Sequence, residues 1–318
     1  MLIDTIKRVL GFVGLFRREA KRAPGQFLDR VYSNGAGNRS YKLYIPGRIR
    51  GRRVSLVVML HGCTQTPDDF ATGTRMNDLA DKHGFLVVYP AQSASANAFT
   101  CWNWFRVEDQ AREAGEPALI AGITREVASE HSVDAARTYI AGLSAGGAMA
   151  LVLGATYPDL FSAVGVHSGL PYRAAHDAAS AMAAMRGRTS RLDSTEATPA
   201  IPTIVFHGDR DTTVAVGNGS AIVDRAVSNA ERVLGPLRKA IRERISGHGR
   251  PYTATTYSAS RAGSFVEYWV LHGAGHAWSG GFSKGSFTEA AGPDASAEMV
   301  RFFLERRAQG LRPGAGLT

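Results

Sequence analysis

The chain has 318 residues, of which 44% are hydrophobic, with 37 Lys and Arg against 28 Asp and Glu and a formal net charge of +9. This composition excludes a mainly disordered chain, and no apolar run reaches the roughly 18 residues of an ordinary transmembrane helix. The two cysteines exclude a disulfide scaffold and a cysteine-rich zinc module. The basic residues follow no RNA-reading or zinc-finger pattern, so we expect a solvated basic surface and no nucleic-acid partner.

Residues 1–26 are expected to form a leader that precedes the folded part. The apolar run Val9–Phe16 follows Lys7 and Arg8, which resembles the first two regions of a signal peptide. Arg17 and Arg18 follow at once, however, without a small-x-small cleavage site. A short amphipathic or disordered leader is therefore favoured over a cleaved signal, and export stays open.

From residue 27 onwards, predicted strands alternate with predicted helices. The expected strands are Tyr41–Ile45, Ser55–Leu60, Phe85–Tyr89, Thr138–Ala141, Ala163–His167, Thr203–His207 and Phe265–Leu271. The expected helices are Met76–His83, Pro117–His131, Ala145–Tyr157 and Ala295–Arg307. Two stretches interrupt this alternation: residues 173–200 predict a cap or mobile insertion, and residues 217–250 a charged helix and a loop.

Most of the predicted strands are continuous apolar runs, which is typical of strands buried on both faces. The alternation therefore predicts an α/β fold with a mainly parallel sheet and helices on both faces. We expect a single domain over residues 27–310, followed by a tail at residues 311–318.

The segment Gly142-Leu143-Ser144-Ala145-Gly146 fits the pattern G-x-S-x-G. The pattern alone occurs by chance roughly 0.2 times in a chain of this composition, but here it lies between a predicted strand and a predicted helix. A nucleophile elbow requires that context, because the serine takes a strained conformation that only small neighbours permit. We expect Ser144 to be the nucleophile and the Ala145 N–H to be one oxyanion donor.

A serine nucleophile needs a base and an orienting acid, which in this fold class follow in the order Ser, Asp or Glu, His. Asp209 and Asp211 follow one later strand, and His272 and His276 follow another. We favour Asp211 as the acid, with Asp209 fixing its loop, and His276 as the base, with His272 packing at a strand end. A metal pair formed by the two histidines is the alternative, which the intervening glycines disfavour. No metal and no cofactor are expected.

The second oxyanion donor is expected in the loop after an early strand. Gly62 permits a sharp turn there, and the Cys63 N–H is the favoured donor. His61 precedes Ser144, which is the wrong order for a base in this fold, so we expect it to be structural.

These motifs together resemble polyhydroxybutyrate depolymerase-type esterases of the α/β-hydrolase superfamily, to which feruloyl and acetylxylan esterases are related. The resemblance rests on HGCTQTPDDFATGTRMNDLAD from His61, CWNWF from Cys101, GLSAGGAMA from Gly142 and GAGHAW from Gly273. It implies a serine esterase with Ser144, Asp211 and His276 as the triad and Cys63 and Ala145 as the oxyanion donors. It also implies short-chain 3-hydroxyalkanoate esters as substrates and an extracellular or periplasmic location.

The resemblance makes Trp102 and Trp278 candidate substrate-binding residues, whereas core packing is an equal alternative for Trp104. Secreted polymer-degrading members usually carry a separate substrate-binding domain, which is not expected after residue 310 here, so soluble oligomers or small esters are the expected substrates. The alternatives are a feruloyl or acetylxylan esterase on the same triad and, in another class, a non-catalytic hydrolase-fold binding protein. The oligomeric state stays open.

Cys63 and Cys101 both fall within the motifs that carry the resemblance. A disulfide between them would close a loop of about 39 residues and contribute roughly 4 kcal/mol in the chain-entropy model. It would imply an oxidising compartment. Two buried free thiols in a reducing cytoplasm are the alternative.

Overall fold

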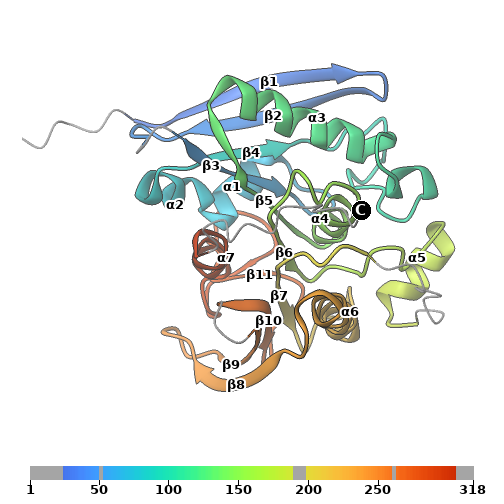
Figure 1. The fold of residues 1–318 in the computed structure, drawn as a ribbon, viewed down its shortest axis with the longest axis vertical. Coiled ribbons are helices and arrows are strands. Elements are labelled where there is room, and N and C mark those ends of the chain that lie inside the picture. Colours follow the sequence, from blue (N-terminus) through green and yellow to red (C-terminus); the bar gives the residue numbers. More distant parts are fainter. Residues whose placement is uncertain (1–23, 50–52, 189–197, 260–262, 306–318) are drawn as a thin grey trace, which may run out of the picture.

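The computed structural model describes residues 24–49, 53–188, 198–259 and 263–305 (Figure 1). The expected tail and all but the last three residues of the expected leader lie outside this part of the chain. Of the expected insertion, residues 189–197 lie outside it as well. No helix within the described ranges is both long and apolar enough to cross a membrane.

A ten-stranded sheet forms the centre of the molecule, in the order β1-β2-β4-β3-β5-β6-β7-β10-β9-β8. The strands are β1 (Gln26–Asn34), β2 (Gly37–Ile45), β3 (Val54–Leu60), β4 (Leu86–Pro90), β5 (Val133–Leu143), β6 (Ala163–His167), β7 (Thr203–Gly208), β8 (Arg238–Ile245), β9 (Pro251–Ser258) and β10 (Ser264–Leu271). From β4 to β10 every neighbouring pair is parallel. The pairs at the two edges are antiparallel. The predicted mainly parallel sheet is therefore confirmed.

Helices cover both faces of this sheet. They are α1 (Pro67–Thr74), α2 (Met76–His83), α3 (Gly115–Glu130), α4 (Ala145–Thr156), α5 (Ala178–Met185), α6 (Gly217–Leu234) and α7 (Ala295–Leu304), with a 3-10 turn, η1 (Val107–Gln110). Figure 1 shows α3, α4 and α6 to the right of the sheet and α2 and α7 to its left.

The two helical layers enclose two separate cores because successive side chains of a strand point to opposite faces. In β3, for example, Leu56, Val58 and Leu60 belong to the core under α3 and α4. Val57 and Met59 belong to the core under α1, α2 and α7. This double burial explains why β3 reads as a continuous apolar run.

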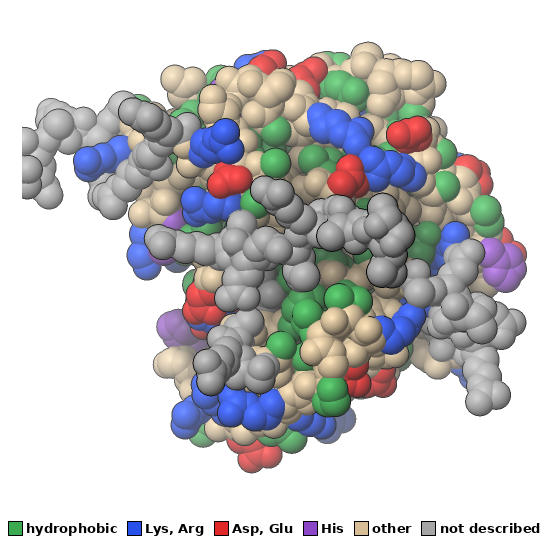
Figure 2. Space-filling view, in the orientation of Figure 1, with side chains coloured by type: hydrophobic (Ala, Val, Ile, Leu, Met, Phe, Trp, Pro, Cys, Tyr) green, Lys and Arg blue, Asp and Glu red, His purple; other side chains and the backbone are tan. Residues whose placement is uncertain are grey.

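The expected charged helix within residues 217–250 is confirmed as α6, but most of the expected loop is wrong, because residues 238–245 form β8, which pairs antiparallel with β9. All eight side chains of β8 are exposed, so the strand has no buried face to leave an alternating pattern. Four of them are the basic residues Arg238, Lys239, Arg242 and Arg244. Charge on an edge strand opposes pairing with another chain. Figure 2 shows Lys and Arg side chains gathered at the lower end of the molecule, where Figure 1 places β8.

A small two-stranded sheet, β11 (Trp278–Ser279) with β12 (Thr288–Glu289), follows β10. It lies just after the predicted histidine loop. The ends of β3, β5, β7 and β10, which carry the predicted site residues, all lie at the carboxyl edge of the parallel part of the sheet.

Candidate active site

Ser144 lies in a sharp turn between β5 and α4. Its backbone has φ 56° and ψ −120°, a conformation that costs free energy for any residue other than glycine. The Ser144 N–H donates to the carbonyl oxygen of His167 at 2.8 Å, which holds the turn against the end of β6. A side chain at Gly142 would collide with the backbone of Gly146, and one at Gly146 with the carbonyl oxygen of Leu60. The turn therefore requires both glycines, as a nucleophile elbow does.

Asp211 follows β7 and forms a hydrogen bond with His276, which follows β10. The Asp211 Oδ2 and the His276 Nδ1 are 2.7 Å apart. The other oxygen, Oδ1, accepts the N–H groups of Thr213 and Val214 at 2.9 and 2.8 Å. The Asp211 side chain is fully buried and that of His276 is 12% exposed. One oxygen of the acid is thus held by its own loop, and the other oxygen contacts the histidine.

The protonation of this pair follows from the pKa of Asp211. Burial raises that pKa, but the hydrogen bond and charge of His276 and the N–H of Val214 outweigh burial, so the pKa lies below its ordinary value. An ionised carboxylate only accepts hydrogen bonds. The His276 Nδ1 therefore carries the proton of this hydrogen bond, which assigns the role of general base to Nε2.

The structure brings the acid and the base together, but it does not join them to the serine. Within the described residues no hydrogen bond connects the Ser144 hydroxyl with His276. Such bonds are often long without substrate and shorten when substrate binds. Ser144 and His276 nevertheless lie on loops at the same edge of the sheet, because β5, β6, β7 and β10 are consecutive neighbours.

Two backbone N–H groups on loops at the same edge of the sheet as Ser144 are free to bind an anion. In the described part of the chain, neither the Cys63 N–H nor the Ala145 N–H has a hydrogen-bond partner. Ala145 is the first residue of α4, so its N–H also lies at the positive end of the helix dipole. Both groups were expected as oxyanion donors.

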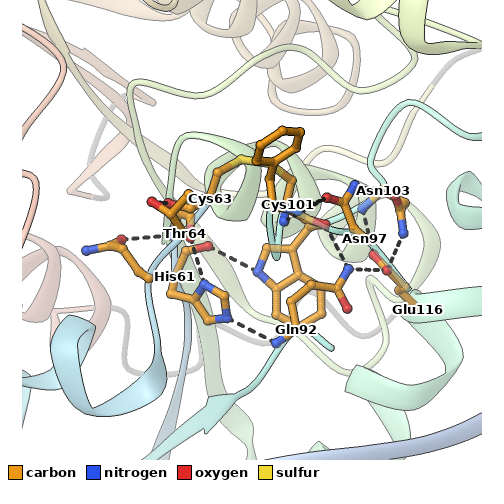
Figure 3. Close-up of a disulfide and its surroundings, with 12 residues drawn as sticks. His61, Cys63, Thr64, Gln92, Asn97, Cys101, Asn103 and Glu116 are labelled. Carbon is orange, nitrogen blue, oxygen red and sulfur yellow. Dashed lines mark hydrogen bonds between the residues drawn. A yellow bond between two sulfur atoms is a disulfide. The ribbon is translucent and has the colours of Figure 1, made fainter. Parts of the chain in front are cut away.

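The loop that carries Cys63 is fastened at several points (Figure 3). A disulfide joins Cys63 to Cys101. The Gly62 N–H donates to the Gln65 side chain at 2.9 Å, and the Thr64 N–H donates to the carbonyl oxygen of Phe99 at 2.7 Å. The position of the Cys63 N–H is therefore set by the segment that contains Cys101.

His61 lies buried beneath this loop and has no role as a base in the structure. Its Nε2 accepts the Gln92 N–H at 3.0 Å, and its Nδ1 donates to the carbonyl oxygen of Gly62 at 2.8 Å. Burial lowers the pKa of His61 to about 4, so the ring is neutral and fixed in one tautomer. The arrangement fits the structural role expected for it.

The tryptophans do not lie where substrate could touch them. Trp102 and Trp278 are 0% and 1% exposed. The Trp102 indole donates to the carbonyl oxygen of His61 at 3.1 Å, and the Trp278 indole to the Ser296 hydroxyl at 3.0 Å. Their expected place in a substrate cleft does not fit this burial, because both rings fill the core beneath the site loops. Trp104 is buried as well.

Two buried histidines next to the site were missed by the sequence analysis. His167 connects the turn of Ser144 with the segment after His276, because its carbonyl oxygen accepts the Ser144 N–H and its Nε2 accepts the Ser279 N–H at 3.0 Å. His207 donates from Nε2 to the carbonyl oxygen of Val214 at 2.8 Å and lies 3.5 Å from the Asp211 Oδ2. The available signal was their position, since each lies at or next to the carboxyl end of a buried strand.

Asp209 and His272, the residues not favoured for the triad, also form a hydrogen bond with each other. The Asp209 Oδ2 and the His272 Nδ1 are 3.0 Å apart, and the Asp209 Oδ1 accepts the Gly273 N–H at 2.6 Å. Asp209 thus fixes a loop, as expected. His272 was expected to pack at the strand end, but its side chain is 42% exposed and contacts Thr253. Among the described residues no three His, Cys, Asp or Glu side chains form a metal-binding group.

Residues 39–250 match the family model described as Esterase PHB depolymerase. The chain is 30% identical over 260 residues to poly(3-hydroxyalkanoate) depolymerase C of Paucimonas lemoignei, which covers 77% of this chain and 60% of that protein. It is 34% identical over 159 residues to the probable acetylxylan esterase A of Aspergillus fumigatus, covering 48% and 41%. The chain thus spans at most about three fifths of the length of these two relatives.

Among solved structures, the acetyl xylan esterase from Aspergillus awamori superimposes with a TM-score of 0.66. The match covers 89% of this chain and all of that one, at 19% sequence identity. This similarity concerns the fold, and it confirms the α/β-hydrolase architecture expected from the sequence.

Proposed function

We propose that this chain, which belongs to the esterase PHB depolymerase family, hydrolyses carboxylic esters through an acyl-enzyme on Ser144. The observation that carries the proposal is the conjunction at one edge of the sheet. A strained serine, two free N–H groups and an Asp–His pair with an ionised carboxylate occur there together. Acyl transfer needs these three elements: a nucleophile, a stabilised oxyanion and an oriented base.

The proposed reaction follows from these positions. The His276 Nε2 takes the proton of the Ser144 hydroxyl as the serine oxygen attacks the ester carbonyl. Asp211 holds the imidazole in one tautomer and stabilises the imidazolium that forms. The N–H groups of Cys63 and Ala145 bind the oxyanion. The alcohol leaves with the proton from His276, and a water molecule then hydrolyses the acyl-serine with the same base.

For the substrate we propose short-chain 3-hydroxyalkanoate esters or oligomers. The name of the Paucimonas lemoignei relative, which aligns with 77% of this chain, supports this class. Acetylated xylan is the second candidate, which the 34% identity to the acetylxylan esterase of Aspergillus fumigatus favours. Hydroxybutyrate oligomers, acetylated xylan and methyl ferulate, assayed side by side, distinguish the candidates by their kcat/KM values.

The test of the reaction is the variant Ser144→Ala with p-nitrophenyl butyrate. We expect kcat to fall by about 10⁶-fold, because the nucleophile of a triad cannot be replaced by its neighbours. In parallel, a serine-directed phosphonate is expected to label the wild type and not the variant. A Ser144→Ala variant as active as the wild type would refute the assignment, and an unlabelled wild type would favour a non-catalytic binding protein.

We also propose an extracellular or periplasmic location. The Cys63–Cys101 disulfide supports it, because structural disulfides persist in oxidising compartments and are rare in the cytosol. Fractionation of the native host, with the redox state of the two cysteines measured by alkylation, tests this proposal.

A further inference from the structure

A second hydroxyl–imidazole–carboxylate chain lies next to the candidate active site, on β9 and the two loops that carry Asp211 and His276. The Thr253 hydroxyl oxygen is 2.8 Å from the His272 Nε2. The His272 Nδ1 is 3.0 Å from the Asp209 Oδ2. The three groups therefore have the order and the spacing of a nucleophile, a base and an orienting acid.

The ionisation of Asp209 determines which groups donate and which accept in these two hydrogen bonds. Burial raises the pKa of Asp209, but hydrogen bonds from His272 and the Gly273 N–H outweigh it, so the pKa lies below its ordinary value. The ionised carboxylate accepts a hydrogen bond from the His272 Nδ1–H, and in the neutral ring Nε2 is then the acceptor. The Thr253 hydroxyl is then the donor to Nε2. In this arrangement His272 is ready to remove the hydroxyl proton.

The chain of groups is open to small molecules. The side chains of His272 and Asp209 are 42% and 33% exposed, and Thr253 is partly exposed. Thr253 lies on the regular antiparallel strand β9, paired with Val270 of β10. It lacks the strained turn that Ser144 has at the start of α4. We therefore expect Thr253 to react more slowly than Ser144 and to favour small esters with good leaving groups.

We propose that Thr253 is a second acyl-accepting hydroxyl of this protein, which takes the acyl group of small activated esters with His272 as its base and Asp209 as the group that orients the base. The Thr253 oxygen forms a bond to the ester carbonyl carbon, and the bond from that carbon to the alcohol oxygen breaks. The His272 Nε2 takes the hydroxyl proton and delivers it to the leaving alcohol. The products are an O-acyl threonine and a free alcohol, and no further reactant is needed.

The test uses the full chain with Ser144→Ala, so that the main nucleophile is absent and the outcome is independent of the proposed esterase reaction. This variant is treated with p-nitrophenyl acetate and quenched in acid, and acetylated peptides are quantified by mass spectrometry. Thr255 is the internal control, because it lies on the same strand and the same face. We expect Thr253 to be acetylated at least about tenfold faster than Thr255, and the rate to fall by about 10²-fold in Ser144→Ala/His272→Gln.

Two results would overturn the proposal. One is acetylation of Thr253 no faster than that of Thr255. The other is a Thr253 rate that is unchanged by the loss of the His272 base. If His272→Gln lowers the thermal midpoint so far that the protein is not folded, Ser144→Ala/Asp209→Asn replaces it. That variant keeps the shape of the acid and is expected to slow Thr253 acetylation at least about tenfold, whereas an unchanged rate contradicts the proposal.

Discussion

The molecule has two Asp–His pairs. In both, the acid follows β7 and the histidine follows β10, but the two pairs differ in their exposure to solvent. Asp211 and His276 are buried and nearly buried, whereas Asp209 and His272 are partly exposed. Both pairs have the same bond, from a carboxylate oxygen to Nδ1. An Asp–His pair alone therefore does not distinguish a candidate site for ester hydrolysis. The neighbours of the buried pair, a strained serine and two free N–H groups, distinguish it.

The two acids are also held for different purposes. Asp211 accepts hydrogen bonds from two N–H groups of its own loop, and these hold its carboxylate in position to bind His276. Asp209 accepts a hydrogen bond from the Gly273 N–H of the loop after β10, so it connects that loop with its own loop after β7. An exposed pair contributes about 0–1 kcal/mol to stability. Breaking a buried pair by removing one partner costs about 3–5 kcal/mol.

The largest contrast is expected between the two histidines. His276→Gln should lower kcat for p-nitrophenyl butyrate by about 10⁴-fold or more, because the base is lost. His272→Gln should stay within about threefold of the wild type, since its pair is exposed and does not serve Ser144. Steady-state kinetics of both purified variants measure the contrast. Equal losses would mean that the two pairs are not functionally distinct.

The disulfide should matter to the buried pair's site and not to the exposed one. Cys63→Ser/Cys101→Ser is expected to lower the free energy of unfolding by about 4 kcal/mol, from the loop it opens. Its kcat should also fall, by up to about 10²-fold, because the Cys63 N–H loses its anchor. Acetylation of Thr253 in the Ser144→Ala background should keep its rate. Denaturant titration and steady-state kinetics test this, and an unchanged kcat would show that the disulfide does not hold the Cys63 N–H in place for catalysis.

His207 approaches the acid of the buried pair, Asp211, so it offers a finer comparison. His207→Leu removes the N–H that lies 3.5 Å from the Asp211 Oδ2, and we expect kcat to fall about tenfold as the acid shifts. His207→Gln keeps an N–H donor on a side chain of similar reach and should recover most of the loss. The ratio of the two variants separates positioning of Asp211 from simple loss of packing, which both variants would share. If neither changes kcat, His207 does not position the acid.

A further prediction concerns the dependence of stability on pH through the buried histidines. Burial lowers the pKa of His61 to about 4 and that of His167 to about 3, from an ordinary value of 6.5. Between pH 6.5 and 4 the unfolded chain binds protons that the folded chain does not, so stability falls as the pH falls. Each ring contributes up to about 1.4 kcal/mol per pH unit in this window. His61→Gln should show a shallower slope in denaturant titrations, and a slope equal to the wild type's would contradict a neutral buried His61.

The sequence predicts the parallel part of the fold because its strands are buried on both faces. The apolar runs of β3, β4, β6 and β7 need no tertiary information to be recognised. The helix Met76–His83 is predicted to the residue. The strand β8 could not be predicted, because its stability comes from pairing with β9 and its side chains contact water.

The same limit applies within the site. The pattern around Ser144 is local, so the turn can be predicted from five residues. The preference for Asp211 over Asp209 depends on distance from the strand end. In the structure the first acid, Asp209, pairs with the first histidine, His272, and Asp211 pairs with His276. The burial of Trp102 and Trp278 and the contact of His207 with Asp211 depend on packing between elements. Such contacts leave no spacing pattern in the sequence.

The central claim is that Asp211, and not Asp209, serves the catalytic histidine. Replacing each acid by Asn tests it most directly, because Asn keeps the shape of the side chain and removes its charge. The measurement is kcat/KM for p-nitrophenyl butyrate of Asp211→Asn beside Asp209→Asn, with folding of each variant checked by its thermal midpoint. We expect kcat/KM to fall by about 10⁴-fold for Asp211→Asn and by less than about threefold for Asp209→Asn. Similar losses in both, or a larger loss for Asp209→Asn, would contradict this claim.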